Sequence, residues 1–149
     1  MVIAVATQEE IDQVKQHFQT TLGNLPGAIR AMADYAPDVL LGYTRMRKAI
    51  YRDKAAGGGL DVKTKELLYS VFDVIAGNLD GAKNHYGAAH REGVTLPEIT
   101  EACMIAMHVF GVQCWGLTGY KLCDYAAELE KAELEKAGLA KAGGKAKQA

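Results

Sequence analysis

Two residues with acid–base side chains stand out from the segments that contain them. His85 lies in a stretch built mostly from Gly and Ala, where an imidazole ring has few large neighbours to hide it from a ligand. Glu66 begins an otherwise apolar helical segment. Because the ordinary pKa of histidine lies near neutral, its ring can accept and donate a proton within one reaction. We therefore interpret His85 as a general acid/base and Glu66 as the carboxylate that orients or charge-pairs it.

Structural explanations exist for both residues. The histidine could be a core residue bonded to a backbone carbonyl, or a subunit-interface residue, and a first-turn carboxylate is favoured by the helix dipole. Further side chains are candidates for lining a substrate pocket, although capping, packing or a bond to another helix would explain each of them. These candidates are Tyr69, Asp80, Tyr86, His108 and Trp115.

No metal or cofactor is expected from the pattern. His85, His108 and Glu66 lack the His-x-x-x-His or Glu-x-x-His spacing with which one helix presents metal ligands. The cysteine count is odd and contains no Cys-x-x-Cys, which predicts free, mostly buried thiols in a reducing compartment rather than disulfides. The three cysteines are Cys103, Cys114 and Cys123.

Apolar residues recur at helical spacing along the chain and predict an all-α bundle of about six helices. Capping boxes open the segments after Thr7 and Thr95. The helix from Thr95 to Phe110 is apolar nearly all round, so we expect it to be central and buried. A last helix is predicted from Gln113 to Lys136, and only Val2 to Ala6 could form a strand.

A chain of 149 residues suggests one domain. We divide it into an N-terminal helix (1–24), a helical domain (25–136) and a low-complexity Ala/Gly/Lys tail (137–149). A net charge of -1 gives no attraction to nucleic acid or anionic membrane. No apolar run approaches the roughly 18 residues of a membrane span, and the N-terminal apolar run is too short for a signal peptide. We expect a soluble, cytoplasmic protein.

Basic residues cluster on one predicted helix and the loop after it. They are interpreted as a solvated face, with the alternative that they draw an anionic substrate toward a cleft. His17, in a polar context, is interpreted as solvated. The basic residues are Arg45, Arg47, Lys48, Arg52 and Lys54.

The order and spacing of several motifs resemble the alkyl hydroperoxidase D / carboxymuconolactone decarboxylase family. The matching motifs are Lys65-Glu66-Leu67, then His85 with Ala89 and Gly93-Val-Thr95, then Glu98-Ile99, within a similarity from Leu25 to Tyr120. This resemblance implies an AhpD-like helical fold that assembles as trimers or hexamers, with sites near the subunit contacts and a small molecule as substrate.

Two branches of that family imply different chemistry. The peroxidase branch places Cys-x-x-Cys between the glutamate and the histidine, but those positions are Asn78 and Gly81 here. Thiolate attack on a peroxide would then need relocated cysteines. The decarboxylase branch needs no cysteine, and its acid–base groups protonate the carbon that loses carbon dioxide. We therefore expect a lyase or isomerase acting on a small carboxylate or lactone, with His85 and Glu66 as its catalytic residues. The alternatives are a hydroperoxide reductase with relocated cysteines and a non-catalytic binder or assembly subunit.

Overall fold

The computed structural model describes residues 6–146, with side chains up to residue 138. Those residues form helices and turns without any strand, which confirms the all-α prediction. The possible strand at Val2 to Ala6 falls almost entirely outside them. The elements are α1 Gln8–Leu22, α2 Gly27–Tyr35, α3 Pro37–Ile50, the 3-10 turn η1 Lys54–Ala56, α4 Val62–Ile75, α5 Leu79–Arg91, α6 Leu96–Phe110, α7 Val112–Cys114, the π-helical segment η2 Trp115–Gly119 and α8 Tyr120–Ala146.

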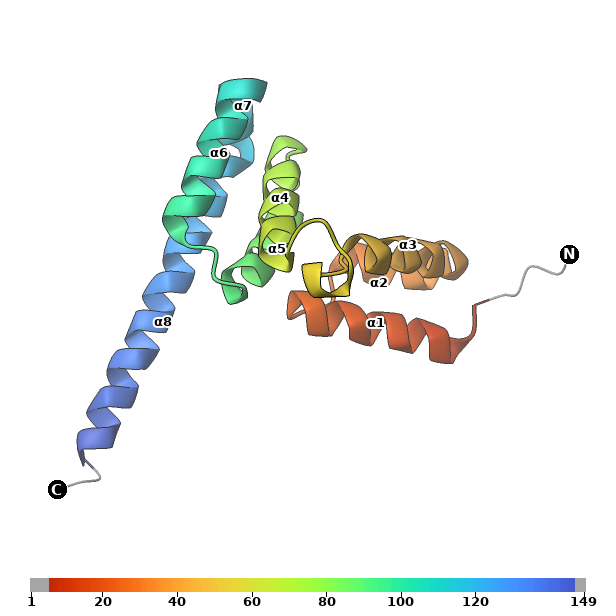
Figure 1. The fold of residues 1–149 in the computed structure, drawn as a ribbon, viewed down its shortest axis with the longest axis horizontal. Helices are drawn as coiled ribbons and strands as arrows, with labels where there is room; N and C mark the ends of the chain where they lie inside the picture. Colours follow the sequence, from red (N-terminus) through yellow and green to blue (C-terminus); the bar gives the residue numbers. More distant parts are fainter. Residues whose placement is uncertain (1–5, 147–149) are drawn as a thin grey trace, which may run out of the picture.

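Helices α1, α2 and α3 form one arm of the molecule (Figure 1). A capping box between Thr7 and Glu10 starts α1, as predicted, and Gly23 ends it with φ +80°. The apolar stripe of α1 then packs against α2, α3 and one residue of α5, Ala88. Because this core includes α5, the first arm is joined directly to the centre of the fold. The predicted domain boundaries (1–24, 25–136 and 137–149) remain predictions.

The antiparallel helices α4 and α5 form that centre. Asp61 caps α4 and Asn78 caps α5, and Gly77 with φ +73° makes the tight turn between them. Small side chains on α5, Ala82 and Ala89, are completely buried. Their small size allows α5 to approach its neighbours closely, and this packing offsets the low helix propensity of Gly81 and Gly87.

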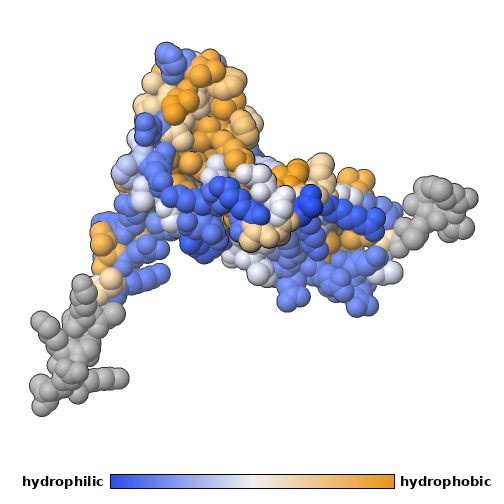
Figure 2. All heavy atoms as spheres, viewed as in Figure 1, coloured by the Kyte–Doolittle hydropathy of each residue, from blue (hydrophilic) through white to orange (hydrophobic). Residues whose placement is uncertain are grey.

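Helices α6, α7 and α8 form the second arm, upright in Figure 1. The capping box predicted at Thr95 and Glu98 is present. The prediction that α6 is buried on all sides is wrong for a single copy of this chain. One face packs inward through Ile99, Cys103 and Ala106, whereas Ile105 and Val109 on the other face are 60% and 64% exposed. This exposed face is apolar (Figure 2).

The C-terminal helix differs from its predicted limits. It is preceded by the short α7 and the π-helical η2, where backbone hydrogen bonds span five residues instead of four. It then continues to Ala146, well past the predicted end at Lys136. Within the described residues, no helix is both long enough and apolar enough to cross a membrane.

Candidate functional site

The predicted contact between Glu66 and His85 is present. Glu66 lies on α4 and is 2% exposed, and its Oε2 is 2.7 Å from Nδ1 of His85 on α5. The two residues are 19 positions apart in sequence and meet because α4 and α5 pack side by side. A carboxylate removed from water in this way requires hydrogen-bonding or charged partners. The imidazole is one such partner.

Tyr51, the residue after α3, is a second partner of the carboxylate. Its hydroxyl is 3.2 Å from Glu66 Oε2 and 3.3 Å from His85 Nδ1. Burial raises the pKa of Tyr51, and the negative charge of Glu66 raises it further. The phenol therefore keeps its proton and donates it to Glu66 in a hydrogen bond.

Arg47 on α3 is the third partner, and it is not part of a solvated face. Its side chain is 3% exposed, and Nη2 is 4.0 Å from Glu66 Oε1. Nη1 donates to His17 Nε2 at 3.2 Å and to Thr21 Oγ1 at 3.4 Å. The guanidinium also lies over the Tyr51 ring, 4.0 Å from its centroid. The interpretation of Arg47 and His17 as solvated residues is therefore wrong, because α1 and α3 pack together around both.

The hydrogen bonds indicate the tautomer of His85. Glu66 Oε2 accepts hydrogen bonds, so the neutral imidazole facing it carries its proton on Nδ1. The other nitrogen, Nε2, then has a free lone pair, and no hydrogen bond found among the described residues uses it. The ring of Tyr69 stacks on His85 at 4.9 Å between centroids and limits its rotation. The result is a positioned imidazole with one nitrogen available as a base.

His85 lines a cavity of about 430 Å³ between α1, α2, α3, α4 and α5. This volume is suitable for a small molecule. The lining combines aromatic side chains such as Tyr43 and Tyr69 with polar ones such as Asp73 and Asn84. Burial raises the pKa of Asp73, although a hydrogen bond from Asn78 opposes the change. Asp73 is therefore a carboxyl group with an increased tendency to hold its proton.

The structure brings some of the predicted site residues to this cavity and not others. Tyr69 and Asp80 line it. Tyr86 and Trp115 pack in the core formed by α4, α5, α6 and α8 instead. His108 is exposed on α6 and does not line this cavity. Over the described residues, no group of three His, Cys, Asp or Glu side chains could hold a metal ion.

Sequence analysis missed Tyr51, Asp73 and the role of Arg47. Arg47 and Tyr51 are four residues apart, so they lie on one helical face, and this spacing was a usable signal. Asp73 is seven residues after Glu66 on α4, which is also a same-face spacing. Neither spacing reveals which neighbouring helix the face meets.

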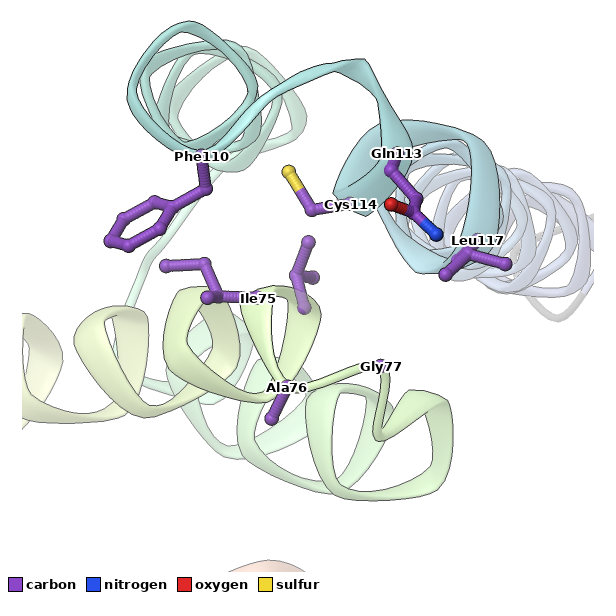
Figure 3. A pocket seen from close by; sticks show the side chains of 8 residues that line it. Ile75, Ala76, Gly77, Phe110, Gln113, Cys114 and Leu117 are labelled. Atoms are coloured by element: carbon purple, nitrogen blue, oxygen red, sulfur yellow. The ribbon is translucent and has the colours of Figure 1, made fainter.

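No cysteine lines the cavity beside His85. Cys103 and Cys114 are buried and Cys123 is half-buried, and all three are free thiols, as predicted. Cys114 lines a separate cavity of about 330 Å³ at the far end of α4 (Figure 3). Phe110, Gln113 and Leu117 surround that cavity. It lies between the end of α4 and the second arm and shares no lining residue with the cavity beside His85.

Comparisons with known proteins identify the family of this chain. The model of the carboxymuconolactone decarboxylase family matches residues 37–113, which contain Arg47, Tyr51, Glu66 and His85. The chain belongs to this family. A crystal structure of a candidate carboxymuconolactone decarboxylase from Burkholderia xenovorans LB400 is 34% identical and superposes with a TM-score of 0.80. The match covers 87% of this chain and 98% of that one. No curated protein matches significantly.

Stability measurements can test the ion pair of this carboxymuconolactone decarboxylase family member. Arg47→Met leaves Glu66 without its positive neighbour, so the free energy of unfolding should fall by about 3 kcal/mol, the low end for breaking a buried ion pair. Adding Glu66→Gln to that variant should restore part of the loss, because the uncompensated charge is gone. Urea denaturation of the two single variants and the double variant measures this coupling. Purely additive effects would show that the two residues do not interact.

Proposed function

We propose that this protein is a cysteine-independent acid–base enzyme that decarboxylates or isomerises a small carboxylate or lactone. The 2.7 Å contact between His85 Nδ1 and the buried Glu66 carboxylate is the observation that carries this proposal. It fixes the ring and leaves Nε2 as the nitrogen that can exchange a proton with a substrate. It also stabilises the imidazolium that forms when Nε2 accepts a proton.

The reaction needs only groups that line the cavity. In a decarboxylation, the bond to the carboxylate carbon breaks, its electron pair passes into the adjacent substrate carbonyl as an enolate, and carbon dioxide leaves. His85 Nε2, which takes up a proton from solvent before the reaction, gives that proton to the carbon that lost carbon dioxide, and the ring returns to its neutral form. In an isomerisation, His85 removes a proton from one carbon and returns it to another. Asp73 also lines the cavity, where burial raises the pKa of its carboxyl group and the hydrogen bond from Asn78 and the charge of His85 lower it.

Replacement of the acid–base residue tests this proposal. His85→Gln should lower the release of carbon dioxide from a reactive carboxylated lactone by about 10²- to 10⁴-fold, the usual contribution of such a group. His90→Gln is the matched control, because His90 lies on the same helix but bonds to the Val94 carbonyl and to Glu133. Its activity should be nearly unchanged.

The same panel of small carboxylated lactones distinguishes an enzyme from a non-catalytic binder. Isothermal titration calorimetry records binding, and proton exchange at the carbon next to the carbonyl records chemistry without net turnover. Tight binding with neither exchange nor carbon dioxide release would contradict the proposal and favour a binding or assembly role.

A second candidate function is favoured by the contact between two thiols. The neighbouring Cys103 thiol lowers the pKa of the Cys123 thiol, and Thr100 Oγ1 donates a hydrogen bond to Cys123 Sγ at 3.6 Å. A Cys123 thiolate could attack a hydroperoxide, releasing the alcohol and leaving a sulfenic acid. Attack by Cys103 would then release water and form a disulfide, which an external dithiol would reduce. This describes a hydroperoxide reductase with relocated cysteines.

Peroxide consumption with a dithiol reductant tests the second candidate. Turnover should disappear in Cys123→Ser and persist in Cys114→Ser, because Cys114 instead bonds the Gly111 carbonyl. Free-thiol titration after peroxide treatment should show the loss of two thiols. The absence of peroxide turnover in the wild-type protein would eliminate this candidate and leave the acid–base proposal untouched.

We also propose that the exposed apolar face of the second arm joins copies of this chain into a trimer or hexamer. Apolar side chains gather on this part of the surface (Figure 2), and a large exposed apolar patch marks an interaction site. The proposal rests on side chains of α4, α6, α7 and η2. They are Leu68, Phe72, Ile105, Val109, Phe110, Val112 and Leu117.

Sedimentation equilibrium tests this assembly. The wild-type protein should sediment as a trimer or hexamer, and the double variant Ile105→Asp with Val109→Asp should sediment as a smaller species, because two charges would enter the apolar contact. Leu134→Asp is the control, since Leu134 is exposed on the distant part of α8. A wild-type monomer at micromolar concentration would refute the proposal.

A further inference from the structure

A second cavity, of about 360 Å³, lies on another side of the buried ion pair. It is bounded by α1, α3, the start of α4 and the end of α5. Glu66 and Tyr51 line it, but His85 does not. This cavity and the cavity beside His85 share one lining residue, Arg47. Arg47 therefore lies between the cavity lined by His85 and a cavity that His85 does not line.

Basic side chains converge on this second cavity from three helices. Arg47 and Lys48 come from α3 and Arg91 from α5, and His17 of α1 contributes its ring. Lys48 and Arg91 are in no ion pair within the described residues. Arg91 is held in place by the hydrogen bond from its Nη2 to the Thr21 carbonyl at 3.1 Å.

Two carboxylates also line the cavity, but they do not cancel this charge. Glu66 is already bonded to His85 and Tyr51 and faces Arg47. Glu92 is exposed to solvent, as are Lys48 and Arg91, so the three cations Arg47, Lys48 and Arg91 still outnumber the two carboxylates. Burial lowers the pKa of His17, and the positive charges of Arg47 and Lys48 lower it further, which is consistent with a positive potential here.

A buried donor at this place lacks a partner. Nη2 of Arg47 is shielded from solvent and makes no hydrogen bond, since its 4.0 Å separation from Glu66 Oε1 is too long for one. A buried charged donor without a hydrogen-bond partner destabilises the fold. A bound oxygen atom would remove that destabilisation. Arginine is well suited to this role, because its planar guanidinium matches the geometry of carboxylate and phosphate.

We propose that this second cavity binds a small oxyanion, either a short dicarboxylate or phosphate, through Arg47, Lys48 and Arg91. The anion accepts hydrogen bonds from Arg47 Nη2, while Lys48 and Arg91 supply the remaining positive charge. An anion bound in this cavity is a second negative group next to Arg47, in addition to Glu66. The oxyanion therefore stabilises the position of the arginine on which the site around His85 depends.

Calorimetric titration with malonate and with inorganic phosphate, at constant ionic strength, tests this site. Saturable binding is expected for at least one of them, and which anion binds tighter identifies the source of the oxyanion. The double variant Lys48→Gln with Arg91→Gln should bind at least 10-fold more weakly. Arg45→Gln with Arg52→Gln is the matched control, because it removes the same charge from exposed residues outside the cavity. The control should bind like the wild-type protein.

Selective isotope labelling of the histidine rings locates the anion. The His17 signals should move on titration, following the same binding curve, because His17 lines this cavity and His85 does not. Equal weakening in both double variants would show mere charge screening and overturn the proposal, as would the lack of saturable binding. Movement of His85 alone would place the anion in the other cavity and also overturn it. Because no turnover is measured, these outcomes are independent of the proposed enzymatic activity.

Discussion

The buried Glu66 carboxylate is the group on which the centre of this protein depends. Isolated in an apolar interior it would be very costly, so it requires partners that are themselves held in place. Arg47 and Tyr51 reach it from α3, and His85 reaches it from α5. Three helices must therefore meet with a fixed register around one side chain. The same contacts that satisfy the charge also set the orientation of the imidazole.

This requirement explains why the fold is built around the α4–α5 pair. Small residues on α5 let it lie close to α4, which brings His85 within hydrogen-bonding distance of Glu66. Helix α1 closes the other side, where His17 and Thr21 accept hydrogen bonds from Arg47. The first arm thus supports the ion pair, and it also forms walls of both cavities. The side chains that pack the first arm onto the centre of the fold are therefore also the ones that form the candidate site.

The second arm follows a different physical rule. Helix α6 is apolar on both its faces, but a single chain can cover only the face that meets α4 and α8. The composition of α6 is that of a helix buried on all sides, but a monomer leaves one face of α6 exposed. Apolar surface gathers on the upper part of the second arm (Figure 2), although α3 in the first arm also exposes Val39, Met46 and Ile50.

Local chemistry made much of this structure predictable from sequence. The capping boxes at Thr7 and Thr95 and the glycine at 23 place helix ends by hydrogen bonds within a few residues, so their positions do not depend on the rest of the fold. The approach of Glu66 to His85 was also expected, through the family pattern. What the sequence could not determine is which face of each helix turns inward. Arg47 is buried and His108 exposed, against expectation, because burial depends on how distant helices cross. Only tertiary contacts decide that, and they alone created the two cavities on either side of Arg47.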